Sequence, residues 1–161
     1  MNANAFRHFY EYHFSQNRKI WEQVALLSQQ EYTRYTNYSY GSARDLIVHM
    51  INVDKSWFTG LRGEEAPEWM APGEIEERSQ LRLYWDEVEG QMRAYLAGLT
   101  DDQLNGKPFP PGEDENLLAW QVLLHVVNHG TDHRAQLLRI LHDMGVNTVS
   151  QDYIFYVYDN P

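Results

Sequence analysis

Residues 123–136 read Leu-Leu-His-Val-Val-Asn-His-Gly-Thr-Asp-His-Arg-Ala-Gln, and they are the most informative stretch of the chain. Three histidines, His125, His129 and His133, follow one another here at intervals of four residues. Each step of four residues turns a helix by only about 40°, so neighbouring histidines stack on one helical face. Two imidazoles at this spacing can grip one metal ion, as they do in the HExxH helices of zinc proteases.

The spacing leaves the metal-binding pair open between His125/His129 and His129/His133, and it makes the remaining histidine structural. A single histidine on an apolar helical face is more often a hydrogen-bonded core residue than a ligand, but three at strict intervals are harder to explain in that way. A metalloprotease is excluded, because Gly130 stands where the HExxH motif requires a glutamate.

A third ligand has to come from another helix, and His49 is the best candidate. It lies beside Leu46 and Val53 in a second predicted helix, so it should point toward the bundle interior, where facing helices build metal sites. His142 follows His133 by nine residues, about 180° around a helix, so these two cannot share an ion. The remaining weaker candidates are His8 and His13.

Apolar residues at helical spacing predict four long amphipathic helices, over residues 5–27, 42–60, 74–97 and 117–144. Capping-box patterns at 28–31 and 100–103 predict two additional short helical turns. Four such helices are expected to pack as an all-α four-helix bundle, with connections long enough for crossovers. The aromatic tail at 152–158 is either a short strand-like segment or an apolar strap laid on the helices. The tryptophans expected in the core are Trp21, Trp57, Trp85 and Trp120.

Composition bounds the function. The chain has 161 residues, which fits one domain spanning 1–161, and its net charge of −10 disfavours binding to nucleic acid or to anionic membranes. It has no cysteine, which excludes a disulfide framework and a protein-borne thiol nucleophile. No apolar run is long enough to span a membrane and the opening segment lacks the core of a signal peptide, so the expected location is the cytoplasm. Three aspartates are more easily read as solvated surface groups than as orienting partners for an imidazole: Asp45, Asp54 and Asp132.

The pattern around the histidines resembles a known signature. Residues 125–137 read His-Val-Val-Asn-His-Gly-Thr-Asp-His-Arg-Ala-Gln-Leu, and they are followed by Leu-His-Asp-Met-Gly at 141–145 and Asp-Tyr-Ile-Phe-Tyr at 152–156. This sequence resembles the DinB-like superfamily of damage-inducible, metal-binding bundles, which includes the YfiT-type proteins and is unrelated to the lesion-bypass polymerase of the same gene name. The region of Tyr12 and Asn17, and the helix of His49 with the Trp57 that follows, also fit.

The resemblance implies a bundle of up-down-down-up order with short connecting helical turns and an extended C-terminal tail. It also implies a three-histidine site for a divalent ion, nickel or zinc, with one ligand from the second helix and two from the last. Carried over by position, the ligands are His49, His129 and His133, which leaves His125 as a neighbour. Asp132 stands where the family often has a further histidine that is not a ligand.

Characterised members of the superfamily resemble transferases or isomerases that use low-molecular-weight thiols such as bacillithiol or mycothiol. Three imidazoles leave a coordination position open, and a thiol bound there would be deprotonated and attack an electrophile. The alternatives are a metal-hydroxide hydrolase and a non-enzymatic metal-binding stress-response protein. A homodimer joined through the aromatic tail at 153–158 is expected, and so is loss of the ion as the pH falls below the ordinary histidine pKa of about 6.5.

Overall fold

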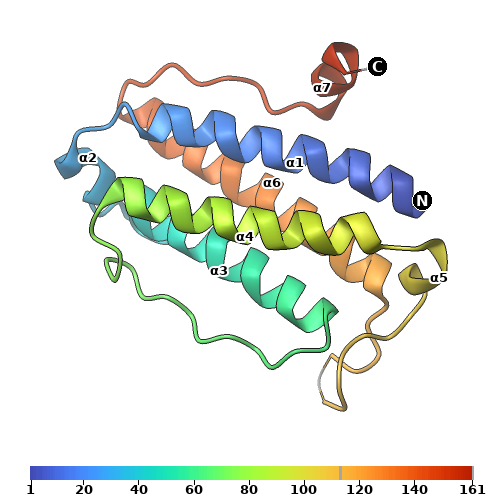
Figure 1. Ribbon diagram of the computed structural model, residues 1–161. Helices are drawn as coiled ribbons and strands as arrows, with labels where there is room; N and C mark the ends of the chain where they lie inside the picture. The colour runs from blue at the N-terminus through green and yellow to red at the C-terminus, as the bar shows by residue number, and fades with distance from the viewer. Residues whose placement is uncertain (113, 161) are drawn as a thin grey trace.

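Four long helices form a bundle in the computed structural model, which describes residues 1–112 and 114–160 (Figure 1). They are α1 (Ala3–Val24), α3 (Ala43–Leu61), α4 (Arg78–Gly98) and α6 (Ala119–Asp143), with the short helices α2 (Gln29–Thr33), α5 (Asp101–Leu104) and α7 (Tyr153–Asp159) between and after them. α1 and α6 run in one direction and α3 and α4 in the other, which is the expected up-down-down-up order. No strand occurs in the described ranges, so the all-α fold class is confirmed.

Because α3 and α4 run in the same direction, the connection 62–77 has to return along the length of the bundle (Figure 1). Asn52 in α3 fixes the middle of this connection. Its side-chain amide donates to the Met70 carbonyl oxygen at 2.8 Å, and the Met70 N–H donates back to Asn52 Oδ1 at 3.0 Å. This buried pair of hydrogen bonds holds the neighbouring Trp69 against α3.

Side chains at the helix starts explain most of the element boundaries. Ser42 caps α3 by accepting a hydrogen bond from the Asp45 N–H at 3.1 Å, and both predicted capping boxes start the short helices α2 and α5. The predicted start of the third long helix at residue 74 is wrong, since α4 begins at Arg78. The Glu74 carboxylate accepts from the Ala71 N–H at 2.9 Å, which stabilises a turn there instead.

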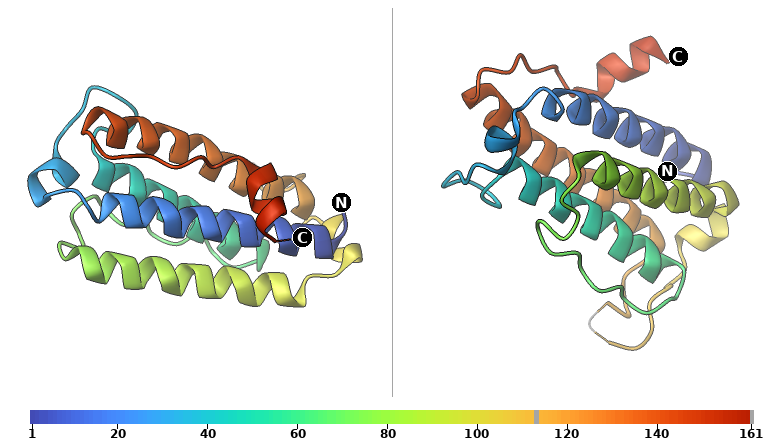
Figure 2. Two further views of the ribbon diagram at one scale, coloured as in Figure 1. Left: turned by 90° about the horizontal axis from the view of Figure 1, so that it is seen from above. Right: turned by 60° about the vertical axis from the view of Figure 1, so that its left-hand side comes forward.

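The C-terminal tail runs back along the bundle and ends in α7 over α1 (Figure 2). The strand-like alternative is therefore wrong, and the apolar strap is the better description. Tyr153 packs edge-on against Phe9 and Tyr12, with ring centroids 5.3 and 5.1 Å away, and Tyr156 packs on Tyr12 at 5.7 Å. Helical spacing puts Tyr153 and Tyr156 on the same face, whereas a strand would separate them.

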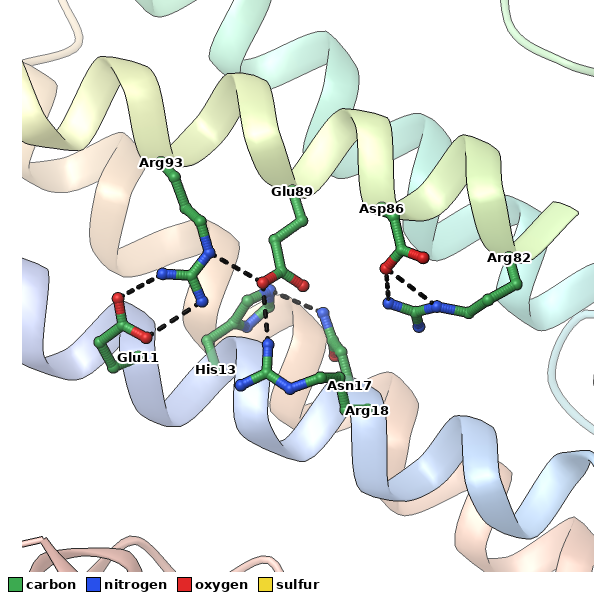
Figure 3. Close-up of polar contacts among 8 residues, drawn as sticks. All are labelled: Glu11, His13, Asn17, Arg18, Arg82, Asp86, Glu89 and Arg93. Carbon is green, nitrogen blue, oxygen red and sulfur yellow. Dashed lines mark hydrogen bonds and ion pairs between the residues drawn. The ribbon is translucent and has the colours of Figure 1, made fainter.

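Charged residues join α1 to α4 along the outside of the bundle (Figure 3). The Glu89 carboxylate accepts from Arg18 at 2.8 Å and from Arg93 at 2.9 Å, and Arg93 also donates to Glu11. Exposed pairs of this kind contribute at most about 1 kcal/mol each.

The apolar core between the four helices holds most of the buried side chains, including Trp85. Trp120 is surface-exposed, contrary to expectation. Within the described residues, no helix has both the length and the apolarity to cross a membrane.

Candidate metal centre

Three histidines converge where α3 packs against α6. The Nε2 atoms of His49 and His129 are 3.0 Å apart, and one ring nitrogen from each of His49, His129 and His133 lies within 4.8 Å of the others. Tetrahedral coordination with Zn–N bonds of about 2.0–2.1 Å requires nitrogens about 3.3 Å apart. Small side-chain rotations therefore suffice for these three nitrogens to hold one divalent ion.

Gln136 determines which nitrogen of His133 is free. The Gln136 side-chain amide donates from Nε2 to the Asp132 carboxylate at 3.0 Å, so its Oε1 atom faces His133 Nδ1, also at 3.0 Å. Since an amide oxygen can only accept, His133 carries its proton on Nδ1 and keeps the Nε2 lone pair for a ligand bond. Asp132 is exposed, as expected, yet it orients an imidazole through Gln136.

Burial keeps two of the three imidazoles neutral. Desolvation, with a contribution from the neighbouring His133, lowers the pKa of His49 from 6.5 to about 4. Desolvation lowers the pKa of His129 to about 3, with smaller contributions from His133 and His49. Only a neutral imidazole can bind a metal ion, so these environments favour the state that coordination requires.

The lowered pKa values predict how the metal-free protein responds to acid. Between about pH 4 and pH 6.5, unfolded histidines bind protons that folded His49 and His129 do not, so the free energy of unfolding falls as the pH drops through this window. We expect the melting temperature of chelator-treated protein to be constant near pH 7–8 and to decrease steadily from pH 6.5 to pH 5. A His49→Gln/His129→Gln variant should show a shallower decrease, and an equal slope in both proteins would contradict the assignment.

Two aromatic side chains from long connections cover the histidine triad. The Tyr40 ring stacks on His49 at 3.9 Å between centroids, with an angle of 18° between the planes. The Trp69 ring meets His49 edge-on at 5.8 Å. Tyr40 is 48% exposed and Trp69 is 56% exposed, so the triad lies beneath aromatic side chains that face solvent. Neither residue could be singled out from the sequence, because both lie outside the regular helical pattern.

The remaining histidines of α6 and α1 stay outside the triad. His125 is exposed and contacts the Trp57 ring at 5.2 Å and the His129 ring at 5.7 Å. His142 and His8 are also exposed. The weaker candidates His8 and His142 and the open candidate His125 therefore all lie outside the group of three nitrogens.

A buried polar cluster next to the triad was not anticipated. Arg134 donates from Nη1 to Asn17 Oδ1 at 2.8 Å and lies 3.2 Å from His13 Nδ1. The other ring nitrogen of His13, Nε2, lies 3.1 Å from Asn17 Nδ2 and 3.6 Å from Asp54 Oδ2. Desolvation lowers the pKa of His13 more than the Asp54 carboxylate raises it, so the ring is neutral. The expectation of a solvated Asp54 is wrong, since it is only 3% exposed.

Gly130 allows this cluster to lie directly behind the ligand helix. A Cβ atom at Gly130 would stand 2.5 Å from His13 Cε1 and 3.0 Å from Arg134 Nη1. The glycine inside α6 and the arginine directly after His133 are the two sequence signals that could have revealed the cluster. The buried cluster ties α1, α3 and α6 together beside Gly130, the residue that follows His129.

The fold and the triad define a class: four-helix bundles with an interhelical site able to hold a divalent ion. The sequence model of the DinB family matches residues 1–160, and the chain belongs to the DinB family. It is 26% identical over 172 residues to Protein DinB of Bacillus subtilis (strain 168), with 98% of this chain and 96% of that protein covered.

Proposed function

We propose that His49, His129 and His133 bind one divalent ion, zinc or nickel, and that the protein is a metal-dependent transferase acting on a low-molecular-weight thiol. The observation that carries this proposal is the set of three imidazole nitrogens, two of them on rings kept neutral by burial, on a side of the bundle open to solvent. Imidazole ligands suit zinc and nickel, and three protein ligands leave a position open for a substrate.

The ion would lower the pKa of a bound thiol and so supply the nucleophile that a chain without cysteine lacks. The three histidines would hold the ion, and Gln136 keeps His133 in the tautomer that leaves its Nε2 atom free. In the transfer, the thiol loses its proton and its sulfur forms a bond to an electrophilic carbon. The electron pair of the bond that breaks leaves with a halide, passes to the oxygen of an epoxide, or passes to the far carbon of an activated alkene. The oxygen or carbon then takes up a proton, which balances the proton lost by the thiol; with a halide, that proton goes to solvent. The cytoplasm, where small thiols stay reduced, is the compartment in which we propose that this occurs.

A conjugation assay tests the proposed transfer. Zinc- or nickel-loaded protein is mixed with a panel of reduced thiols and with an epoxide, an activated alkene or an aryl halide, and the thioether is measured by mass spectrometry. We expect a rate above that of free metal and thiol, lost in His133→Ala and retained in His142→Ala. If the loaded protein accelerates none of these reactions, the transferase proposal fails, and a metal-hydroxide hydrolase or a non-enzymatic metal-binding protein remains.

We also propose that the protein forms a homodimer through the outer face of α7. This face leaves Ile154, Phe155 and Tyr158 exposed by 48%, 52% and 71%, and apolar side chains grouped in this way favour association. Sedimentation should give a species of twice the monomer mass of 19.0 kDa. Phe155→Asp should shift it to the monomer, and Leu26→Asp, at an exposed apolar position outside α7, should not. A wild-type monomer at micromolar concentration would contradict the dimer.

A further inference from the structure

A cavity of about 510 Å³ opens between the second half of α3 and the two long connections 62–77 and 105–118. Its walls are mainly aromatic. Trp57 from α3 meets Phe109 edge to face, with ring centroids 5.8 Å apart, and Trp69 lines the side toward the triad. Pro110 and Pro111 add further apolar surface. Flat rings are the shape that such walls accommodate best, because aromatic pairs prefer offset or edge-to-face contacts.

Gly60 shapes one wall of this cavity. It lies inside α3, where a Cβ atom would overlap the Phe109 ring, so the ring can lie against the helix only because residue 60 is glycine. A glycine in a helix interior costs about 1 kcal/mol relative to alanine. Its presence here places Phe109 opposite Trp57, and the cavity depends on that placement.

The polar groups of the cavity select among aromatic ligands. Ser56 lines the cavity, and its buried Oγ atom has no hydrogen-bond partner among the residues that the structure describes. A change of the Ser56 χ1 rotamer is needed to turn this hydroxyl toward a ligand. Such an unpaired group is unfavourable until a ligand atom bonds to it. The charged residues among those described as lining the cavity are Glu64, Glu65 and Asp114, all acidic. They repel an anionic ligand at the entrance.

The cavity adjoins the triad through its tryptophans. Trp69 contacts both the cavity and His49, and Trp57 contacts His125, which in turn lies beside His129. We propose that this cavity binds a flat aromatic molecule without negative charge, held between Trp57, Trp69 and Phe109 with one polar atom at Ser56. That this molecule is the electrophile that receives the thiol rests on the proposed function above, whereas the binding itself does not.

Binding is tested on the full chain without added thiol, using 2-naphthylmethanol, 2-naphthylmethylamine and 2-naphthoate. These probes share one naphthalene ring system and are neutral, positively charged and negatively charged, respectively. The indole N–H resonances of the five tryptophans report the location in NMR spectra. We expect the alcohol and the amine to shift the signals of Trp57 and Trp69 but not those of Trp21 and Trp85, and the carboxylate to bind at least about tenfold more weakly. Equal binding of the carboxylate, or shifts confined to other tryptophans, would overturn the proposal.

Two glycine substitutions provide a matched pair. Gly60→Ala should displace Phe109 and weaken binding of 2-naphthylmethanol by about tenfold or more, the size expected for loss of an aromatic contact. Gly90→Ala, on the exposed face of α4, should bind as wild type, because the added Cβ meets no described residue within 4 Å apart from its chain neighbours and the adjoining helix backbone. Ser56→Ala should weaken the binding of 2-naphthylmethanol and leave the affinity for naphthalene unchanged. Equal affinities in the Gly60 and Gly90 variants would contradict the cavity as the site.

The binding and conjugation results separate the two proposals. Ring binding at Trp57 and Trp69 without thioether formation supports the cavity and rejects the transferase. Thioether formation without such binding rejects the cavity and leaves the transferase standing.

Discussion

Purified His129→Ala protein is expected to lose most of the metal that the wild type binds. His129 occupies the centre of the triad, with its ring 4.2 Å from that of His133 and its Nε2 atom 3.0 Å from that of His49. Two remaining imidazoles on different helices cannot replace it. The affinity should fall by more than the roughly 10- to 100-fold that follows loss of an outer hydrogen-bond partner. Elemental analysis and competition with a chelator measure both quantities.

Two other histidine variants make this test specific. His142→Ala should retain the metal, because His142 is exposed and lies around the helix from the triad. His125→Ala should also retain it, because His125 lies outside the group of three nitrogens. If His125→Ala loses the ion while His133→Ala keeps it, the ligand pair on α6 is the wrong one.

Replacement of Arg134 by alanine is expected to lower the free energy of unfolding by about 3–5 kcal/mol, the usual cost of leaving buried charged and polar partners unpaired. Arg134 is only 1% exposed, and its guanidinium donates to Asn17 and to the Gln151 side chain and faces His13. Its removal leaves the nearby Asp54 carboxylate without compensating charge. Urea unfolding followed by circular dichroism measures the loss.

Arg139→Ala is the matched control, since Arg139 lies on the same helix but is exposed and pairs with Asp143 on the surface. We expect a far smaller change in its urea midpoint. Similar midpoints for the Arg134 and Arg139 variants would show that the buried cluster contributes little to stability.

Local signals in the sequence determined much of the fold. The side chains of Ser28, Ser42 and Thr100 each satisfy an otherwise free backbone N–H, so three helix starts could be predicted from hydrogen bonding within four residues. The start of α4 at Arg78 and the helical state of the tail depend on contacts that periodicity does not encode. Glu74 closes a turn, and the rings of α7 pack on Phe9 and Tyr12.

The candidate site likewise divides into features that local sequence predicts and features that depend on tertiary contacts. Spacing aligned His125, His129 and His133 on α6, but it could not choose a pair, because the choice depends on where α3 packs. The family resemblance supplied that choice, whereas His49 could be selected from its place beside Leu46 and Val53 in the second helix. The aromatic cover could not be predicted, since Tyr40 and Trp69 reach the triad from connections whose paths follow from tertiary contacts. The burial of Asp54 likewise depends on His13, which lies on a different helix.

The return connection between α3 and α4 has more residues than are needed to span the length of α3. α3 has 19 residues, so its axis is about 28 Å long, and an extended chain covers that distance in about nine residues. The connection has sixteen residues, 62–77, and it is anchored in its middle by Asn52. The surplus residues can change in number and kind while the bundle and its triad keep their geometry. Variation in this one segment, which carries Trp69, therefore gives the scaffold a way to acquire new ligand preferences without refolding its core.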